Sequence, residues 1–354
     1  MKVACLGGGP AGLYFAISMK LRQPEAQVTV IERNKPDDTF GWGVVLSDDA
    51  LENLSANDPK SAEAIRESFA YWDDIAVVHN GTRTVSGGHG FAGIGRRQML
   101  LLLQDRAREL GVDLQFETIA KTAAEYQADY DLVVGCDGLN SNVRNEFAEH
   151  FKPEIDVRPC KFIWLGTHQK FDDAFTFIFE KTKHGWMWIH AYQFDADTAT
   201  VIVECSAETW ENWGFEGMSK EETVRTCEEI FAAHLDGHAL MSNAAHLRGA
   251  AVWINFPGCC ARNGIMRMWC YWGMHPPPRI SLSGRGRGWR LTVPLRWLSW
   301  SAPNRRWNAH SSVTRRSGGW MCCGCNRRRA TPWSGLKRSS AIWIWIRCSS
   351  TIPC

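Results

Sequence analysis

Six residues near the start of the chain could hold the phosphates of a dinucleotide. Gly7-Gly8-Gly9-Pro10-Ala11-Gly12 has the spacing G-x-G-x-x-G, between an apolar segment at 2–6 and a segment with apolar residues at helical spacing at 11–22. Gly7 would allow a tight turn, Gly9 would let the backbone approach a pyrophosphate, and Gly12 would let helix and strand pack closely. The free N–H groups of the helix N-terminus would face the phosphates.

An acidic residue completes this pattern. Glu32 follows a second apolar segment at 28–31 and stands twenty residues after Gly12. Its carboxylate could accept hydrogen bonds from ribose hydroxyls and would repel the extra phosphate of NADP. A glycine-rich turn without a ligand is the simpler alternative, but spacing, flanking elements and acidic residue together favour a βαβ dinucleotide site. Both NAD and FAD use this motif, so it does not choose between them.

The rest of the first 257 residues predicts a further helix, further strands and a second sheet. A helix is expected from Arg96 to Leu110, and strands at 112–116 and 130–135, the second of which delivers Asp137-Gly138 into a loop. Four segments between 161 and 205, FIWLGT, FTFIFE, WMWIHAYQF and ATVIVEC, alternate like strands of a mainly antiparallel sheet. Its apolar aromatic face would suit a planar ring. Ser219 opens a capping box for a helix to about Leu235.

Several of these segments carry a family resemblance. The D-G-x-x-S-x-V-R pattern from Asp137 to Arg144 resembles the Asp-Gly motif of single-component flavoprotein monooxygenases of the para-hydroxybenzoate hydroxylase type. FGWGVVLSDDALENL at 40–54, HGFAGIGRRQMLLLLQDRA at 89–107 and KFIWLGTH at 161–168 are most similar to the anthraniloyl-CoA monooxygenase and salicylyl-CoA 5-hydroxylase families. The resemblance covers residues 1 to about 257. More distantly, the chain resembles the hydroxylases of indole pigment pathways.

The resemblance implies an α/β fold in two parts. A Rossmann-like FAD-binding domain would comprise residues 1–70 and 95–155, and an inserted, mainly antiparallel β-sheet domain for the substrate would comprise residues 71–94 and 156–257. The resemblance also implies the residues that contact FAD. They are Gly7, Gly9 and Gly12 at the pyrophosphate, Glu32 at the ribose, Arg33, Arg96, Asp137 and Gly138 elsewhere along the cofactor, and Gly43 in the segment that passes the isoalloxazine ring.

Simpler interpretations stand beside these assignments. Arg96 could be a solvent-facing residue, with Arg97 as its substitute; Asp137-Gly138 could be a plain turn, and Trp42 could serve packing. His168, His190 and Tyr192 of the predicted sheet could touch a substrate, but a histidine satisfied within its sheet is commoner. The sequence therefore assigns no catalytic side chain.

The activity that the resemblance implies is hydroxylation of an aromatic ring. NAD(P)H would reduce FAD, O2 would add to form a flavin C4a-hydroperoxide, and a hydroxyl group would pass to a ring activated by an amino or hydroxyl group, such as an aminobenzoyl- or hydroxybenzoyl-CoA thioester. The cofactor performs this chemistry, and the protein must exclude water. Two alternatives are an FAD-dependent reductase or dehydrogenase and a non-enzymatic nucleotide-binding remnant whose basic tail binds nucleic acid without specificity.

Composition divides the chain at Pro257. All 38 Asp and Glu residues lie before it, whereas the following 97 residues hold 17 Lys and Arg, ten Trp and eight Cys. The overall composition excludes a disordered chain. Without a signal peptide or an apolar run of membrane length, we expect a cytoplasmic protein whose five scattered cysteines before Pro257 are free thiols. The spacing of Cys322, Cys323 and Cys325 matches no common zinc site, so no metal is expected.

The unusual tail, residues 258–354, is explained by a shifted reading frame. Family members carry a later Gly-Asp motif that contacts FAD, and none follows Pro257. Read one base earlier, the codons of residues 269–275, WCYWGMH, must encode V, V, L, L, G, then N, D, H or Y, then A. This frame permits VVLLGDA, which contains the missing motif. We therefore predict a frameshift near Gly258 and a truncated or inactive chain that retains FAD weakly or not at all.

Overall fold

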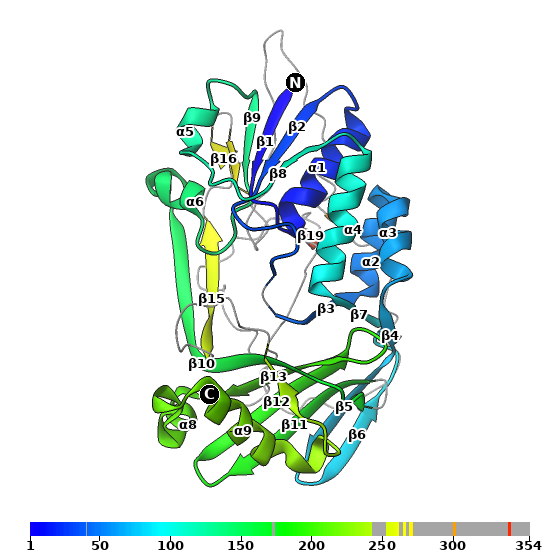
Figure 1. Cartoon of the computed structure of the whole chain (residues 1–354), viewed down its shortest axis with the longest axis vertical. Coiled ribbons are helices and arrows are strands. Elements are labelled where there is room, and N and C mark those ends of the chain that lie inside the picture. The colour runs from blue at the N-terminus through cyan, green and yellow to red at the C-terminus, as the bar shows by residue number, and fades with distance from the viewer. Residues whose placement is uncertain are drawn as a thin grey trace, which may run out of the picture.

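The computed structural model describes residues 1–39, 41–171, 174–242 and 253–261 in full, and the backbone alone of 265–266, 269–271, 300–301 and 339–340. Figure 1 shows an α/β part at the top and a large sheet at the bottom, joined by long strands at one side. The tail cysteines from which no metal site was expected, the basic residues considered for nucleic acid and most of the predicted frameshifted segment lie outside the described residues.

The chain begins with the predicted βαβ unit. β1 (Lys2–Leu6), α1 (Pro10–Arg22) and β2 (Gln27–Ile31) follow one another, and β1 and β2 pair in parallel with Val3 opposite Val28. All but the first residue of each strand is buried, which explains their continuous apolar sequences. Pro10 stands in the first turn of α1, where its missing N–H costs no helical hydrogen bond.

Four further strands extend this unit into a six-stranded sheet with the order β16-β17-β9-β1-β2-β8, in which every pair is parallel except β16 and β17. The added strands are β8 (Asp113–Gln115), β9 (Leu132–Gly135), β16 (Ile265–Met266) and β17 (Trp269–Tyr271). β17 runs parallel to β9 with residue 269 opposite Val133. The backbone of residues 269–271, which the shifted frame reads as VVL, therefore lies beside β9.

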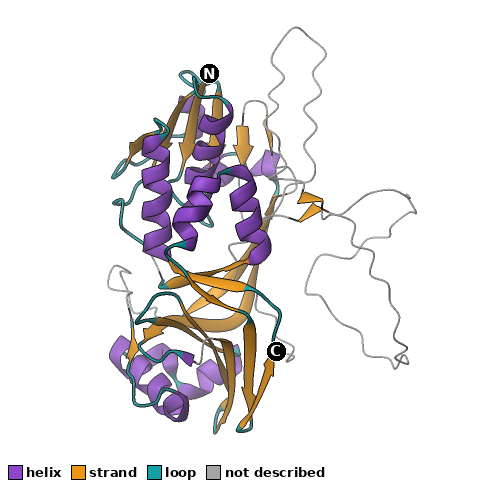
Figure 2. Ribbon diagram, turned by 90° about the vertical axis from the view of Figure 1, so that its right-hand side faces the viewer, coloured by secondary structure: helices purple, strands orange, loops and turns teal. Residues whose placement is uncertain are grey.

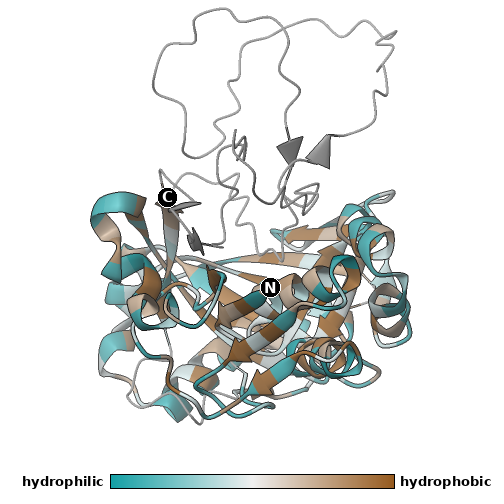
Figure 3. Cartoon of the chain, turned by 90° about the horizontal axis from the view of Figure 1, so that it is seen from above, coloured by the Kyte–Doolittle hydropathy of each residue, from teal (hydrophilic) through white to brown (hydrophobic). Residues whose placement is uncertain are grey.

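Helices stand together beside this sheet (Figure 2). α4 (Arg96–Glu109) packs on α1, and their buried residues share one core with β1 and β2. α3 (Pro59–Arg66) packs on α4, and α2 (Asp48–Asn57) packs on α3; neither was predicted from the sequence. Three short helices, α5 (Ala123–Tyr126), α6 (Asn142–Glu146) and α7 (Ala148–Phe151), flank β9 in sequence. Figure 3 shows apolar residues gathered on the central strands and on the inner helix faces.

A small antiparallel sheet lies between the two parts. Its order is β3-β7-β4, formed by β3 (Gly43–Ser47), β7 (Phe91–Gly95) and β4 (Ala70–Trp72). Gly43 faces Gly95, the residue before α4, so this sheet ties the start of α4 to the segment that follows β2. It packs with Tyr192 and Ile202 of the large sheet in a separate cluster of buried residues.

The large sheet has eight strands. Their order is β14-β10-β13-β12-β11-β5-β6, with β15 on β10, and their bounds are β5 (Asp74–His79), β6 (Thr82–Ser86), β10 (Pro153–Thr167), β11 (Ala174–Thr182), β12 (Gly185–Gln193), β13 (Ala199–Cys205), β14 (Leu240–Met241) and β15 (Ile254–Ala261). Every pair is antiparallel except β5 and β11. The predicted combination of an α/β part with a mainly antiparallel sheet is thus confirmed.

One face of the large sheet is covered by α8 (Ala207–Trp213) and α9 (Lys220–Phe231). The capping box predicted at Ser219 is present, since Ser219 Oγ accepts from the Glu222 N–H and the Glu222 carboxylate accepts from the Ser219 N–H. In the tail, two-residue strands β18 (Trp300–Ser301) and β19 (Ser339–Ser340) pair with each other. None of the helices among the described residues is long and apolar enough to cross a membrane.

Candidate functional site

The glycine-rich loop between β1 and α1 leaves room for a ligand at one glycine only. A Cβ on Gly7, whose φ is +120°, would lie 2.3 Å from the Cys136 carbonyl oxygen, and one on Gly12 would lie 2.0 Å from the Gly7 carbonyl oxygen. A Cβ on Gly9 would meet nothing within 4 Å. Gly7 and Gly12 are therefore required by the packing of the loop, whereas Gly9 borders open space at the N-terminus of α1.

Glu32 lies at the end of β2, beside this loop. Its Oε2 accepts a hydrogen bond from the Gly8 N–H at 2.8 Å, and its Oε1 accepts from the Asn34 N–H at 2.9 Å. Arg33, the next residue, is exposed. The predicted acidic residue and the predicted loop are thus in direct contact.

Asp137 follows β9, the other neighbour of β1. Its Oδ2 accepts from the N–H groups of Asn142 at 2.7 Å and Val143 at 3.2 Å, which caps the start of α6. Its Oδ1 is buried, and no described residue forms a hydrogen bond with it. Because a buried oxygen without a partner is costly, Oδ1 points to a missing donor such as a ligand hydroxyl. Gly138, with φ +77°, is exposed next to it.

These residues share one edge of the parallel sheet. Gly9, Glu32 and Asp137 follow β1, β2 and β9, which are adjacent in the order β9-β1-β2. In open parallel sheets, ligands bind outside the carboxyl ends of the strands. The geometry therefore defines an α/β fold whose edge has the arrangement typical of dinucleotide sites.

A second group of predicted residues gathers at the start of α4. The Arg96 N–H donates to the Trp42 carbonyl at 2.8 Å, and the Arg96 guanidinium lies 6.0 Å from the Trp164 ring centroid. Burial lowers the pKa of Arg96, although the group stays charged. Within the described part of the chain, no carboxylate forms an ion pair with Arg96, whereas the exposed Arg97 pairs with Asp37 at 3.2 Å. Of these two described arginines, Arg96 is therefore the one whose charge is available for an anionic ligand.

Hydrogen bonds to the backbone of Gly43 attach the segment 41–43 to the large sheet. The Gly43 N–H donates to Thr200 Oγ1 at 2.9 Å, and the Tyr192 hydroxyl donates to the Gly43 carbonyl at 2.8 Å. Burial raises the pKa of Tyr192, so its hydroxyl remains a donor. Gly43 thus already uses both backbone hydrogen-bonding groups within the protein.

Two tryptophans also connect this segment to the large sheet, because each packs onto a glycine. A Cβ on Gly41 would lie 2.7 Å from the Trp164 ring, and a Cβ on Gly166 would lie 2.8 Å from the Trp42 ring. Each of the two segments therefore packs a tryptophan against a glycine of the other. We call Gly41, Trp42, Trp164 and Gly166 the Gly–Trp interlock.

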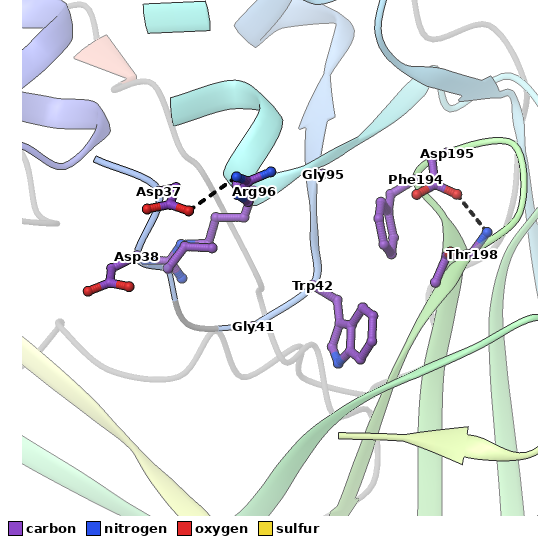
Figure 4. A pocket seen from close by; sticks show the side chains of 11 residues that line it. Asp37, Asp38, Gly41, Trp42, Gly95, Arg96, Phe194, Asp195 and Thr198 are labelled. Atoms are coloured by element: carbon purple, nitrogen blue, oxygen red, sulfur yellow. Dashed lines mark hydrogen bonds and ion pairs between the residues drawn. The ribbon is translucent and has the colours of Figure 1, made fainter. Parts of the chain in front are cut away.

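A pocket of about 430 Å³ adjoins the interlock. It lies between residues 37–42, the start of α4 and the turn after β12, and Figure 4 shows Arg96, Trp42 and Phe194 among its lining side chains. Carboxylates of Asp37, Asp38 and Asp195 also line it. The pocket therefore combines aromatic surface with charges of both signs.

The three sheet residues singled out from the sequence differ in placement. His168 is exposed, and its Nδ1 lies 2.8 Å from the Asp197 carbonyl. Tyr192 and His190 are buried at 1% and 4% exposure. The sequence did not indicate that Thr200 and Tyr192 hold Gly43, although strand alternation places both on one face of the sheet.

The similarities to known proteins agree with this geometry. The chain is 42% identical over 281 residues to salicyloyl-CoA 5-hydroxylase of Streptomyces, which covers 77% of the chain and 53% of the relative. It is 34% identical over 248 residues to protodeoxyviolaceinate monooxygenase of Chromobacterium violaceum, covering 68% of the chain and 65% of the relative. No protein-family model matches the chain.

Solved structures show the same fold. 2-Methyl-3-hydroxypyridine-5-carboxylic acid oxygenase has a TM-score of 0.61 at 18% identity, with 76% of this chain and 74% of that chain covered. p-Nitrophenol 4-monooxygenase of Pseudomonas putida has a TM-score of 0.58 at 15% identity, with 76% and 71% covered. The chain thus has the fold of these aromatic monooxygenases, as its sequence predicted, and most of its length is similar to two further monooxygenases. It spans about half the length of the salicyloyl-CoA 5-hydroxylase that it matches.

Proposed function

We propose that the chain derives from an FAD-dependent monooxygenase that hydroxylates an aromatic substrate with NAD(P)H and O2. The proposal rests on three features at one edge of the parallel sheet. Gly9 borders open space, Glu32 supplies a carboxylate, and Asp137 Oδ1 is a buried oxygen without a described hydrogen-bond partner. When bound, reduced FAD supplies the activated oxygen that is transferred to the ring.

The residues present fit this cofactor. Gly9 and the N-terminus of α1 would hold the pyrophosphate, and Glu32 would exchange its loop contacts for ribose hydroxyls. Asp137 Oδ1 would accept from a hydroxyl of the cofactor, and Arg96 would meet its anionic part. Contacts by Arg33, Gly43 and Gly138 remain predictions.

The chain's own part in the reaction is to keep water out. The Gly–Trp interlock closes the space between residues 41–43 and the large sheet with packed aromatic rings. Because water promotes loss of the activated oxygen, such packing favours transfer to the substrate. This role needs no acid–base pair at the cofactor.

The substrate class is proposed from the relatives. The name salicyloyl-CoA 5-hydroxylase supports a hydroxybenzoyl-CoA thioester, and an aminobenzoyl-CoA thioester is the related alternative. Aromatic side chains on one face of β11 and β12, such as Phe175 and Phe177, suit a planar ring.

Replacement of Gly9 tests the cofactor site. Gly9→Ala adds a methyl group where nothing lies within 4 Å and φ is −71°, so the chain should fold as before. The methyl group would occupy the approach of the pyrophosphate, and FAD affinity, measured by quenching of flavin fluorescence, should fall at least roughly tenfold. Gly217→Ala is the matched control, because its Cβ also meets nothing within 4 Å.

The titration is run on the 354-residue chain and on the product of the corrected reading frame. The two variants are compared in whichever of these two proteins binds FAD. If Gly9→Ala and Gly217→Ala then have equal affinity for FAD, the proposed site is contradicted. Hydroxylation is tested with salicyloyl-CoA, NADH and labelled O2 on the frame-corrected protein. NADH oxidation without incorporation of label into the product would instead support a reductase. Sequencing of the gene decides the frame, since a stop codon in the earlier frame excludes it.

A further inference from the structure

Three polar side chains lie together on the aromatic face of the large sheet. Trp188 and His190 come from β12, and Glu204 comes from β13 directly opposite Trp188. Their exposed fractions are 7%, 4% and 1%. A carboxylate and an imidazole buried this deeply require polar partners, and no step of the proposed function has used them.

Their geometry favours one chemical state of the imidazole. Trp188 Nε1 donates to Glu204 Oε2 at 2.9 Å, and His190 Nδ1 lies 3.8 Å from Glu204 Oε1. A facing carboxylate favours the tautomer with the proton on Nδ1. Burial, opposed by the Glu204 charge, lowers the pKa of His190 and favours its neutral form. Nε2 is then a hydrogen-bond acceptor, and none of the described residues donates to it.

The surroundings of His190 suit an aromatic ligand. The Phe177 ring centroid lies 4.8 Å from that of His190, and the Phe175 centroid lies 6.4 Å away. Both phenylalanines are only partly buried. Their rings therefore form a wall for a planar ring next to the Nε2 acceptor.

His190 is also spaced suitably from the segment 41–43. Tyr192, which holds the Gly43 carbonyl, stands two residues from His190 on the same face of β12, a separation of about 7 Å along the strand. This separation is comparable to the length of one substituted benzene ring. A ring anchored at His190 would thus extend toward the segment that the predicted fold places beside the flavin.

We propose that His190 Nε2 accepts a hydrogen bond from the ring hydroxyl or amino group of the substrate, and that Glu204 and Trp188 are positioning residues. The inference rests on the proposed function for the class of ligand. It predicts selection for rings that carry a hydrogen-bond donor, because an unsubstituted ring would leave the buried acceptor unpaired.

Two ligands that differ by one hydroxyl group test this proposal. Equilibrium dialysis of the full 354-residue chain measures the affinities for salicyloyl-CoA and benzoyl-CoA without FAD. The wild-type chain should prefer salicyloyl-CoA by roughly tenfold, the effect of one buried hydrogen bond. His190→Phe should reduce this ratio to about one while it keeps benzoyl-CoA affinity. His190→Gln should restore part of it, since its amide oxygen reaches the position of Nε2.

Glu204→Gln separates positioning from packing. Trp188 would hold the amide oxygen, so the amide NH2 would face His190 Nδ1 and move the imidazole proton to Nε2. Nε2 would then no longer accept from the substrate hydroxyl, and the ratio should fall below the wild-type value in a variant of unchanged size. This variant tests the proposal if His190→Phe does not fold. His168→Gln, on the exposed sheet histidine, should leave the ratio unchanged.

The proposal is overturned if the wild-type chain shows no preference, if neither ligand binds, or if folded His190→Phe and Glu204→Gln keep the wild-type ratio. FAD binding is titrated separately on the same samples. The variants could lose the preference for salicyloyl-CoA while neither the chain nor its frame-corrected form binds FAD. This result would support the role of His190 and refute the proposed cofactor.

Discussion

Removal of the Tyr192 hydroxyl tests whether the large sheet fixes the segment 41–43. Tyr192 is 1% exposed, and its hydroxyl donates to the Gly43 carbonyl at 2.8 Å. Phenylalanine keeps the ring and its stacking on Trp72, whose centroid is 6.0 Å away. Tyr192→Phe therefore removes one hydrogen bond and leaves a buried carbonyl without its donor, at a cost of about 1–3 kcal/mol in the free energy of unfolding.

Urea denaturation followed by circular dichroism measures this loss. Thr200→Val removes the bond to the Gly43 N–H and should cost a similar amount. Because both bonds hold one peptide segment, the double variant should lose less than the sum of the single losses. Tyr130→Phe, in the α/β part, is the control and should change stability by less than about 0.5 kcal/mol. The reasoning fails if Tyr192→Phe is no less stable than Tyr130→Phe.

Three further predictions concern other parts of the chain. Gly12→Ala should strongly destabilise the βαβ unit or prevent its folding, because the added Cβ would lie 2.0 Å from the Gly7 carbonyl oxygen; a melting temperature equal to that of Gly9→Ala would contradict this. Burial raises the pKa of the Cys5 and Cys205 thiols to about 12, so iodoacetamide at pH 8 should leave both unmodified in the native chain and label them after unfolding, as mass spectrometry can show. Because the pKa of His190 is lowered on folding, the unfolded chain binds more protons as the pH falls below about 6.5, and stability should decrease there. In His190→Phe this decrease in urea stability should be smaller, and an unchanged pH dependence would refute the assignment.

Local sequence signals predicted much of the fold. The βαβ unit, α4 and the four main strands of the large sheet all lie where periodicity placed them, because each has an apolar pattern of its own period. The contact of Glu32 with the glycine-rich loop also follows from a spacing along the chain. In contrast, α2 and α3 were missed, since they lie in a segment interpreted through family resemblance alone.

The inter-domain contacts could not be predicted in the same way. Gly43 is bonded to Thr200 across 157 positions and to Tyr192 across 149, and no local pattern encodes such a pairing. β5 lies parallel to β11 for a similar reason, because pairing depends on the assembled sheet. β10 runs through the predicted domain boundary at residue 155, and the division into domains stays a prediction.

The pairing of residues 269–271 with β9 depends little on their side chains. Residues 269–271 pair with β9 through backbone groups, which every amino acid except proline offers equally. The chain can thus form a strand beside β9 although its residues differ from those that the earlier frame would encode.

The Gly–Trp interlock constrains how this lineage can change. Trp42 needs the bare backbone of Gly166, and Trp164 needs that of Gly41, so each bulky ring depends on a partner position more than a hundred residues away. A methyl group acquired at either glycine would have to be accompanied by a smaller residue at the matching tryptophan. Among homologues we expect these four positions to covary as two pairs, with large and small residues exchanged together.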